Sequence, residues 1–186
     1  GFMGPQVSGK RLGILGLGTI GLEIAKRGAN GFGMSVGYYN RRARPETGYT
    51  YFDTPRALAA ASDFLVVATP GGAGTRHLVN AEVLDALGPD GYLVNIARGS
   101  VVDTAALIAA LAEKRIAGAG LDVVDGEPLV PDALKQLGNV VLTPHSAGRS
   151  PEAVAATVAL FLRNATAHFS GKPVLTPVVE AQAEAA

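Results

Sequence analysis

Short apolar runs along the chain alternate with longer stretches in which apolar residues recur every three or four positions. The runs predict six buried strands, at residues 12–15, 35–39, 64–68, 92–96, 118–123 and 140–142. The longer stretches predict amphipathic helices at 20–31, 54–60, 80–87, 103–113 and 131–137, and an alanine-rich helix over 151–169. Thr54 and Asp103 stand where a helix N-cap is useful. Strands that alternate with helices and are apolar at consecutive positions predict an α/β fold, a doubly wound parallel sheet with helices on both faces.

A glycine-rich turn follows the first predicted strand and opens the first predicted helix. Gly16, Gly18 and Gly21 form a GxGxxG pattern that encloses Thr19 and Ile20. A strand, a glycine turn and a helix in this order are what a Rossmann-type dinucleotide site requires. The first glycine allows a tight turn, the second lets a pyrophosphate approach the backbone, and the third lets the helix pack on the sheet. Free N–H groups at the helix N-terminus favour the anion, so these five residues are predicted to bind a dinucleotide.

The end of the second predicted strand indicates which dinucleotide is bound. Sites for NAD usually carry a carboxylate there, about 20 residues past the glycines, to bind the ribose 2′-hydroxyl. This chain has Asn40 in that place, 19 positions after Gly21, followed by Arg41 and Arg42. The amide can donate a hydrogen bond and the two guanidinium groups can pair with a 2′-phosphate, so NADPH is the preferred cofactor and NAD the alternative. The competing interpretation is that Arg41, Arg42 and Arg44 form a solvated surface cluster.

Three side chains that could form a reaction centre follow three different predicted strands: Arg98, Glu127 and His145. Loops after the strands of an open α/β sheet meet at one edge, where ligands bind. Histidine can move a proton near neutral pH, a neighbouring carboxylate can orient its ring, and an arginine fork can hold a substrate carboxylate. We interpret the remaining histidines, His77 and His168, as structural or solvated.

At these residues the chain resembles the D-isomer-specific 2-hydroxyacid dehydrogenases. The segments 12–21, 95–99, 122–128 and 143–148 are similar to that family's signatures, in the same order and at fitting separations. The resemblance implies that Arg98 binds the substrate carboxylate, that His145 is the general acid in reduction and that Glu127 pairs with His145. It also implies cofactor contacts from Thr69, Pro70, Ile96, Ala97, Arg98, Asp122, His145 and Ala147, with Asp122 near the nicotinamide carboxamide.

Two features separate the chain from typical family members. The Asn40-Arg41-Arg42 segment, together with residues 148–151, looks more like the NADPH-dependent glyoxylate and hydroxypyruvate reductases of the family. Family members also carry a substrate domain whose larger part precedes the nucleotide-binding domain, and we expect that domain to lie outside this chain. We therefore expect residues 1–170 to form the NAD(P)-binding domain and residues 171–186 a C-terminal extension. The full-length protein is expected to be a homodimer acting on a small 2-keto acid.

Composition narrows the remaining function classes. The 186 residues are 48% apolar and 17% charged, with a formal net charge of zero. Scattered basic residues favour neither nucleic acid nor a membrane surface as partner. The absence of cysteine excludes disulfides, thiolate catalysis and cysteine-bound metal, and no histidine and carboxylate spacing resembles a metal site.

We expect a cytoplasmic protein. The alternative to an enzyme is a non-catalytic dinucleotide-binding or nucleotide-sensing module on the same fold.

Overall fold

A computed structural model of the chain describes residues 4–177, and the chain divides into two compact units, Gly1–Ala147 and Gly148–Ala186. The strands of the first unit are β1 (Arg11–Leu15), β2 (Ser35–Tyr39), β3 (Thr50–Tyr51), β4 (Phe64–Val67), β5 (Tyr92–Asn95), β6 (Gly118–Leu121) and β7 (Val140–Leu142). Its helices are α1 (Thr19–Phe32), α2 (Pro55–Ala60), α3 (Ala81–Leu87), α4 (Thr104–Ala112) and α5 (Asp132–Lys135). Short 3-10 helices lie at η1 (Pro45–Thr47), η2 (Ala73–Thr75) and η3 (Gly99–Val101).

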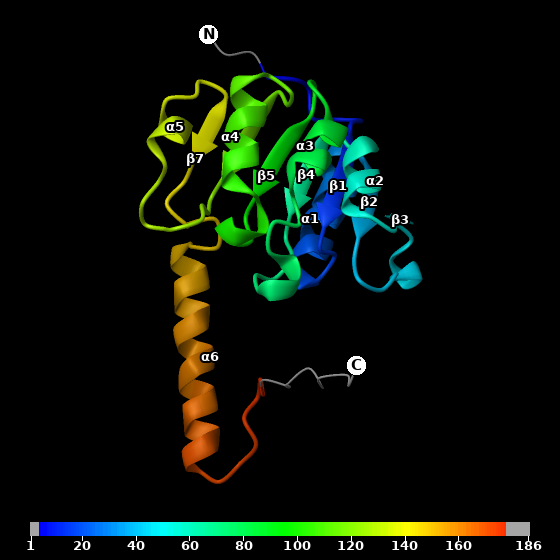
Figure 1. The fold of residues 1–186 in the computed structure, drawn as a ribbon. Coiled ribbons are helices and arrows are strands. Elements are labelled where there is room, and N and C mark those ends of the chain that lie inside the picture. The colour runs from blue at the N-terminus through cyan, green and yellow to red at the C-terminus, as the bar shows by residue number, and fades with distance from the viewer. Residues whose placement is uncertain (1–3, 178–186) are drawn as a thin grey trace. The chain divides into compact units, whose positions relative to one another are not determined.

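The strands of the first unit form one parallel sheet in the order β3-β2-β1-β4-β5-β6-β7 (Figure 1). The chain begins in the middle of the sheet at β1, runs outward to β3, and returns through β4 to build the other half. This order confirms the predicted doubly wound parallel sheet. Ligand sites in such sheets lie beyond the carboxyl ends of the strands where the direction of winding reverses, which here is between β1 and β4.

Two apolar clusters pack on the two faces of the sheet. On β1, Ile14 belongs to the cluster that contains Ala25 of α1, while the next residue, Leu15, belongs to the cluster that contains Leu58 of α2 and Leu84 of α3. Successive side chains of a strand point to opposite faces, so helix α1 covers one face and helices α2 and α3 cover the other. Burial on both faces explains why the strands read as continuous apolar runs.

The predicted elements are present with shifted ends, and the strand β3 and the 3-10 helices η1, η2 and η3 were not predicted. The strand β3 was not predicted because two residues give no apolar period. The helices α2, α3, α4 and α5 each begin one residue later than predicted, since the residue before the helix is its N-cap. The predicted caps are confirmed: the side chain of Thr54 accepts the Ala57 N–H, and that of Asp103 accepts the Ala106 N–H.

The second unit contains helix α6 (Pro151–Phe169), as predicted from its alanine-rich sequence. Ser150 caps the helix by accepting the Ala153 N–H at 3.1 Å. Near the other end, the Asn164 side chain accepts the N–H groups of Leu175 and Thr176, which fixes the chain that follows the helix. Among the helices of residues 4–177, none is long and apolar enough to cross a membrane.

Candidate active site

The glycine loop connects β1 to α1 through a turn that side chains would block. Gly16 has a φ of 102°, and a Cβ atom there would lie 2.6 Å from the backbone nitrogen of Thr69. A Cβ atom on Gly21 would lie 2.2 Å from the carbonyl oxygen of Gly16, so only glycine lets α1 start this close to the strand. The sequence interpretation of these two glycines as turn and packing positions agrees with this geometry.

The N-terminus of α1 has the features of an anion site. Gly18, Thr19 and Ile20 are exposed, and no side chain caps the first N–H groups of the helix. A Cβ atom on Gly18 would meet no atom of the chain within 4 Å, so open space lies in front of this residue. Exposed backbone donors, a helix dipole and open space fit the pyrophosphate of a dinucleotide.

The segment after β2 lies against this loop. The side-chain oxygen of Asn40 accepts the N–H of Leu17 at 2.7 Å, so the amide N–H₂ group of Asn40 is the part that remains to donate toward a ribose. Arg41 and Arg42 are exposed on the same segment. The position and the charge of this segment suit a phosphorylated ribose better than a bare one, because the first residue of the segment is an amide and not a carboxylate.

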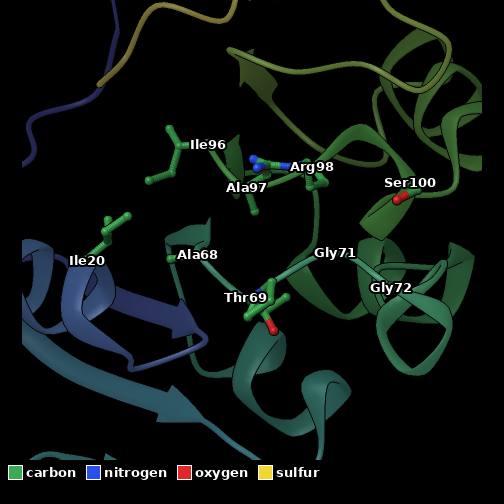
Figure 2. A pocket seen from close by; sticks show the side chains of 10 residues that line it. Ile20, Ala68, Thr69, Gly71, Gly72, Ile96, Ala97, Arg98 and Ser100 are labelled. Carbon is green, nitrogen blue, oxygen red and sulfur yellow. The ribbon is translucent and has the colours of Figure 1, made fainter. Parts of the chain in front are cut away.

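A cavity of about 590 Å³ lies beyond the ends of β4 and β5 (Figure 2). Six of the predicted site residues line it: Ile20, Thr69, Pro70, Ile96, Ala97 and Arg98. Four further lining residues, Ala68, Gly71, Gly72 and Ser100, were not among the predicted site residues. The signal that could have found them is their place in the loops that follow two neighbouring strands of the sheet.

The position of Arg98 depends on close contacts of the turn after β5. The buried Asn95 side chain accepts the Ala97 N–H and donates to the Arg98 carbonyl, which fixes the turn. A Cβ atom on Gly99 would lie 2.0 Å from the Val124 carbonyl carbon, so the turn touches the loop after β6. The Arg98 guanidinium donates to the Ala97 carbonyl oxygen at 2.6 Å, and Arg98 is one of the residues that line the cavity.

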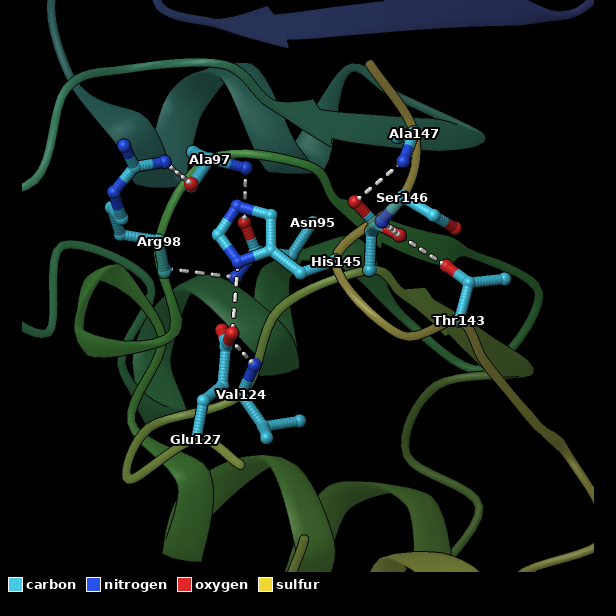
Figure 3. Close-up of polar contacts among 10 residues, drawn as sticks. Asn95, Ala97, Arg98, Val124, Glu127, Thr143, His145, Ser146 and Ala147 are labelled. Atoms are coloured by element: carbon cyan, nitrogen blue, oxygen red, sulfur yellow. Dashed lines mark hydrogen bonds and ion pairs between the residues drawn. The ribbon is translucent and has the colours of Figure 1, made fainter. Parts of the chain in front are cut away.

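His145 and Glu127 come from the loops after β7 and β6 and lie in direct contact. The Nδ1 atom of His145 is 2.8 Å from the Oε2 atom of Glu127, and the other carboxylate oxygen accepts the Val124 N–H (Figure 3). The pairing implied by the resemblance is therefore present. A carboxylate on Nδ1 selects the tautomer with a proton on that nitrogen and leaves Nε2 for exchange with another group. Such a pair can act in general acid and base chemistry.

Asp122 fastens the loop that carries His145. Its carboxylate accepts the Thr143 hydroxyl at 2.5 Å and the N–H groups of Ser146 and Ala147 at 2.8 and 2.9 Å. Burial raises the pKa of Asp122, but the hydrogen bonds from Thr143, Ala147 and Ser146 outweigh burial, so the net pKa lies below its ordinary value. The carboxylate was predicted to lie near a nicotinamide carboxamide, and the structure shows it engaged with its own chain.

The predicted site residues thus fall into three groups within one edge of the sheet. The glycine loop and Asn40 are in contact, six residues share the cavity, and Glu127, His145, Asp122 and Ala147 form the group at the ends of β6 and β7. Glu127 and His145 are not among the residues that line the cavity. His77 lies outside these groups, with its Nδ1 atom 3.8 Å from Asp103, and His168 stacks edge-on against Phe169.

Comparisons with known proteins agree with this arrangement. Residues 1–147 match the model of the family "D-isomer specific 2-hydroxyacid dehydrogenase, NAD binding domain". The chain is 51% identical to hydroxyphenylpyruvate reductase of Plectranthus scutellarioides and to glyoxylate/hydroxypyruvate reductase A of Arabidopsis thaliana, over 94% of this chain and 55% of each relative. The chain therefore spans about half the length of these curated relatives.

A solved structure shows the same fold. The NADPH-dependent glyoxylate/hydroxypyruvate reductase of Sinorhizobium meliloti, in complex with NADP and malonate, superposes with a TM-score of 0.88 at 48% identity. The superposition covers 92% of this chain and 53% of that one. The resemblance inferred from the four signature segments is confirmed. The chain belongs to the family of the NAD-binding domain of D-isomer specific 2-hydroxyacid dehydrogenases.

Proposed function

We propose that the protein containing this chain reduces a small 2-keto acid to the D-2-hydroxy acid with NADPH, and that this chain supplies the cofactor site and the residues for proton transfer. The observation that carries the proposal is the 2.8 Å contact between His145 and Glu127, on loops next to the strand that presents Arg98. The strands β5, β6 and β7 are neighbours in the sheet, so their loops meet at the edge where a dinucleotide binds. The relatives named as glyoxylate and hydroxypyruvate reductases support this choice of substrate class.

NADPH is preferred over NADH because of the segment after β2. Asn40 offers an amide where a carboxylate would repel a 2′-phosphate, and Arg41 and Arg42 add positive charge beside it. The relative from Sinorhizobium meliloti, described as NADPH-dependent, supports the same assignment.

Three side chains of this chain have separate roles in the reduction. A reduced nicotinamide supplies the hydride when it is bound. Arg98, which lines the cavity, holds the substrate carboxylate with its guanidinium group, and this fixes the keto group in one orientation. His145 presents Nε2 to the carbonyl oxygen and gives it a proton. Glu127 accepts a hydrogen bond from the Nδ1–H group, keeps the ring in that orientation and stabilises the cationic form that precedes transfer.

The organisation of the whole protein is part of the proposal. We expect residues 1–170 to act as the cofactor domain and residues 171–186, which lie partly outside the described residues, to be a C-terminal extension that belongs to the substrate domain. The protein is expected to be a homodimer located in the cytoplasm. Light scattering of the purified protein tests the dimer, and fractionation of the source cells tests the location.

The test of the proposal is a pair of measurements. Titration of the chain with NADPH and NADH, followed by cofactor fluorescence, is expected to show tighter binding of NADPH. Replacement of Arg41 and Arg42 by methionine should abolish that difference. The protein containing the chain should oxidise NADPH when glyoxylate or hydroxypyruvate is added. Binding of NADPH without turnover of any small 2-keto acid would favour the nucleotide-sensing module instead.

A further inference from the structure

Arg44 does not share the exposed environment of Arg41 and Arg42. Its guanidinium Nη1 donates to the carbonyl oxygen of Leu17 at 2.7 Å, and its Nε donates to the carboxylate of Glu46 at 2.9 Å. Two of its nitrogen atoms are therefore engaged with the chain itself. The sequence interpretation grouped Arg44 with its two neighbours as one basic cluster, whereas in the structure Arg44 is half-buried and Arg41 and Arg42 are exposed.

The backbone of Arg44 is fixed as firmly as its side chain. Its N–H donates to the hydroxyl of Tyr38 at 2.6 Å, and its carbonyl oxygen accepts the hydroxyl of Thr47 at 2.8 Å. Tyr38 is fully buried in the sheet. The backbone of Arg44 is already fixed, so its side chain loses little further conformational entropy when the guanidinium bonds to the Leu17 carbonyl. The contact with Leu17 is therefore part of the fold.

Leu17 is the residue between the first two glycines, and the segment after β2 binds both of its backbone polar groups. The Leu17 N–H donates to Asn40 and the Leu17 carbonyl accepts from Arg44, both at 2.7 Å. The N–H and C=O of one peptide group point in opposite directions, so a carbonyl held by Arg44 directs the N–H of Gly18 away from Arg44. The orientation of the loop is thereby set before any ligand arrives.

We infer that Arg44 is a positioning residue: it holds the glycine loop in the conformation that receives the pyrophosphate and does not itself bind the 2′-phosphate. The inference rests on the proposed function, because it takes the glycine loop as the cofactor site. It assigns separate roles to three neighbouring arginines. Arg41 and Arg42 select the phosphorylated ribose, whereas Arg44 supports a part of the site that NADPH and NADH share.

This division predicts different binding patterns for matched variants. Arg44→Met removes the donor to Leu17. The affinities for NADPH and NADH should then fall by the same factor, roughly tenfold, because the binding of either cofactor must also order the loop. Arg41→Met, the same change three residues earlier, should lower the affinity for NADPH and leave the affinity for NADH unchanged. Arg44→Lys restores a donor near the Leu17 carbonyl and should recover part of the affinity for both cofactors.

A further control separates positioning from general loss of structure. Thr47→Val removes the hydroxyl bond to the Arg44 carbonyl, but the backbone N–H of Thr47 still donates to that carbonyl at 3.1 Å and the guanidinium stays in place, so both affinities should stay at the wild-type value. Amide hydrogen exchange at Leu17, whose N–H is bonded to Asn40, should speed up in Arg44→Met and remain slow in Thr47→Val. Circular dichroism confirms that each variant is folded before titration.

The experiment is titration of the wild-type chain and these variants with NADPH and NADH, followed by cofactor fluorescence. Equal weakening of both cofactors by Arg44→Met, with partial recovery in Arg44→Lys, supports the inference. Loss of NADPH binding alone would make Arg44 a phosphate ligand, and unchanged binding would make the contact irrelevant; either result overturns the inference and leaves the proposed function intact. A wild-type chain that binds neither cofactor would overturn both.

Discussion

Asp122 holds the backbone on both sides of His145. Its carbonyl oxygen accepts the His145 N–H at 2.9 Å, and its carboxylate accepts the next N–H along the chain, that of Ser146, at 2.8 Å. His145 has a φ of 51°, in the left-handed region that costs a non-glycine residue roughly 1–2 kcal/mol. The bonds to Asp122 offset this cost and aim the imidazole at Glu127. A buried aspartate is thus the support of the proton-transfer residue.

Replacement of Asp122 by asparagine should loosen this loop. An amide has one acceptor oxygen, so its N–H₂ group would face a backbone N–H that the carboxylate now accepts. We expect a loss of about 1–3 kcal/mol in the free energy of unfolding, measured by urea titration, and faster amide exchange at Ser146 and Ala147. Asp125→Asn is the control, since within residues 4–177 the Asp125 carboxylate makes only a long, exposed contact with Arg76, and its loss should change stability little. Unchanged exchange at both amides would contradict this role of Asp122.

Stability should fall at acid pH through two carboxylates. Hydrogen bonds from Arg11 hold the pKa of Asp63 below its ordinary value, and the pKa of Asp122 is lowered as described above. A carboxylate with a lower pKa in the folded chain stabilises it fully above the unfolded pKa, and this contribution disappears as pH falls through the folded pKa. We therefore expect the free energy of unfolding to decline below about pH 4.

A series of urea titrations between neutral and acid pH checks this decline. Asp63→Asn removes one of the two groups, so its stability should be lower than wild type at neutral pH and should depend less steeply on pH below about 4. An identical pH dependence in the variant and the wild type would show that the pair between Arg11 and Asp63 contributes nothing.

Much of the fold could be predicted because the sheet is buried on both faces. Strands with both faces covered read as apolar runs, and the glycine pattern after the first run fixed the order of strand, turn and helix. The two-residue strand β3 and the 3-10 helices carry no period long enough to detect. Their ends depend on tertiary contacts, such as the bond from the Phe52 N–H to the Tyr38 carbonyl.

The candidate site was predictable to the level of residue type but not of contact. Arg98, Glu127 and His145 stood out because they follow strands and carry suitable chemistry. The role of Asp122 was not visible, because its partners lie more than 20 positions away on another strand's loop. Arg44 looked like its neighbours in sequence, and only the fold shows that its guanidinium reaches Leu17.

Gly71 should control the position of Arg98. A Cβ atom on Gly71 would lie 2.8 Å from Cγ and 3.2 Å from Cβ of Arg98, so Gly71→Ala must shift the arginine stem. In the protein containing this chain we expect kcat/KM for the keto acid to fall roughly tenfold or more, because small misplacements of a clamp are costly. Affinity for NADPH, measured by fluorescence titration, should change little. Gly74→Ala in the same loop meets no atom within 4 Å and serves as the control with unchanged kinetics.

His145 should affect turnover far more than cofactor affinity, because its proposed task is proton transfer. Asparagine is the substitution that isolates this task, since it tolerates the left-handed backbone and removes the ring. We expect His145→Asn to lower kcat by about 10²–10⁴-fold, with the NADPH dissociation constant near the wild-type value. His77→Asn is a matched control: His77 has the same φ of 51° and lies outside the three groups of site residues, so kcat should be retained. Glu127→Gln keeps a neutral oxygen beside Nδ1 and should give an intermediate loss, because the ring stays oriented but its cationic form loses a carboxylate partner. Equal kcat values for His145→Asn and His77→Asn would remove His145 from the mechanism, since the two variants differ in the site they disturb and not in the strain they introduce.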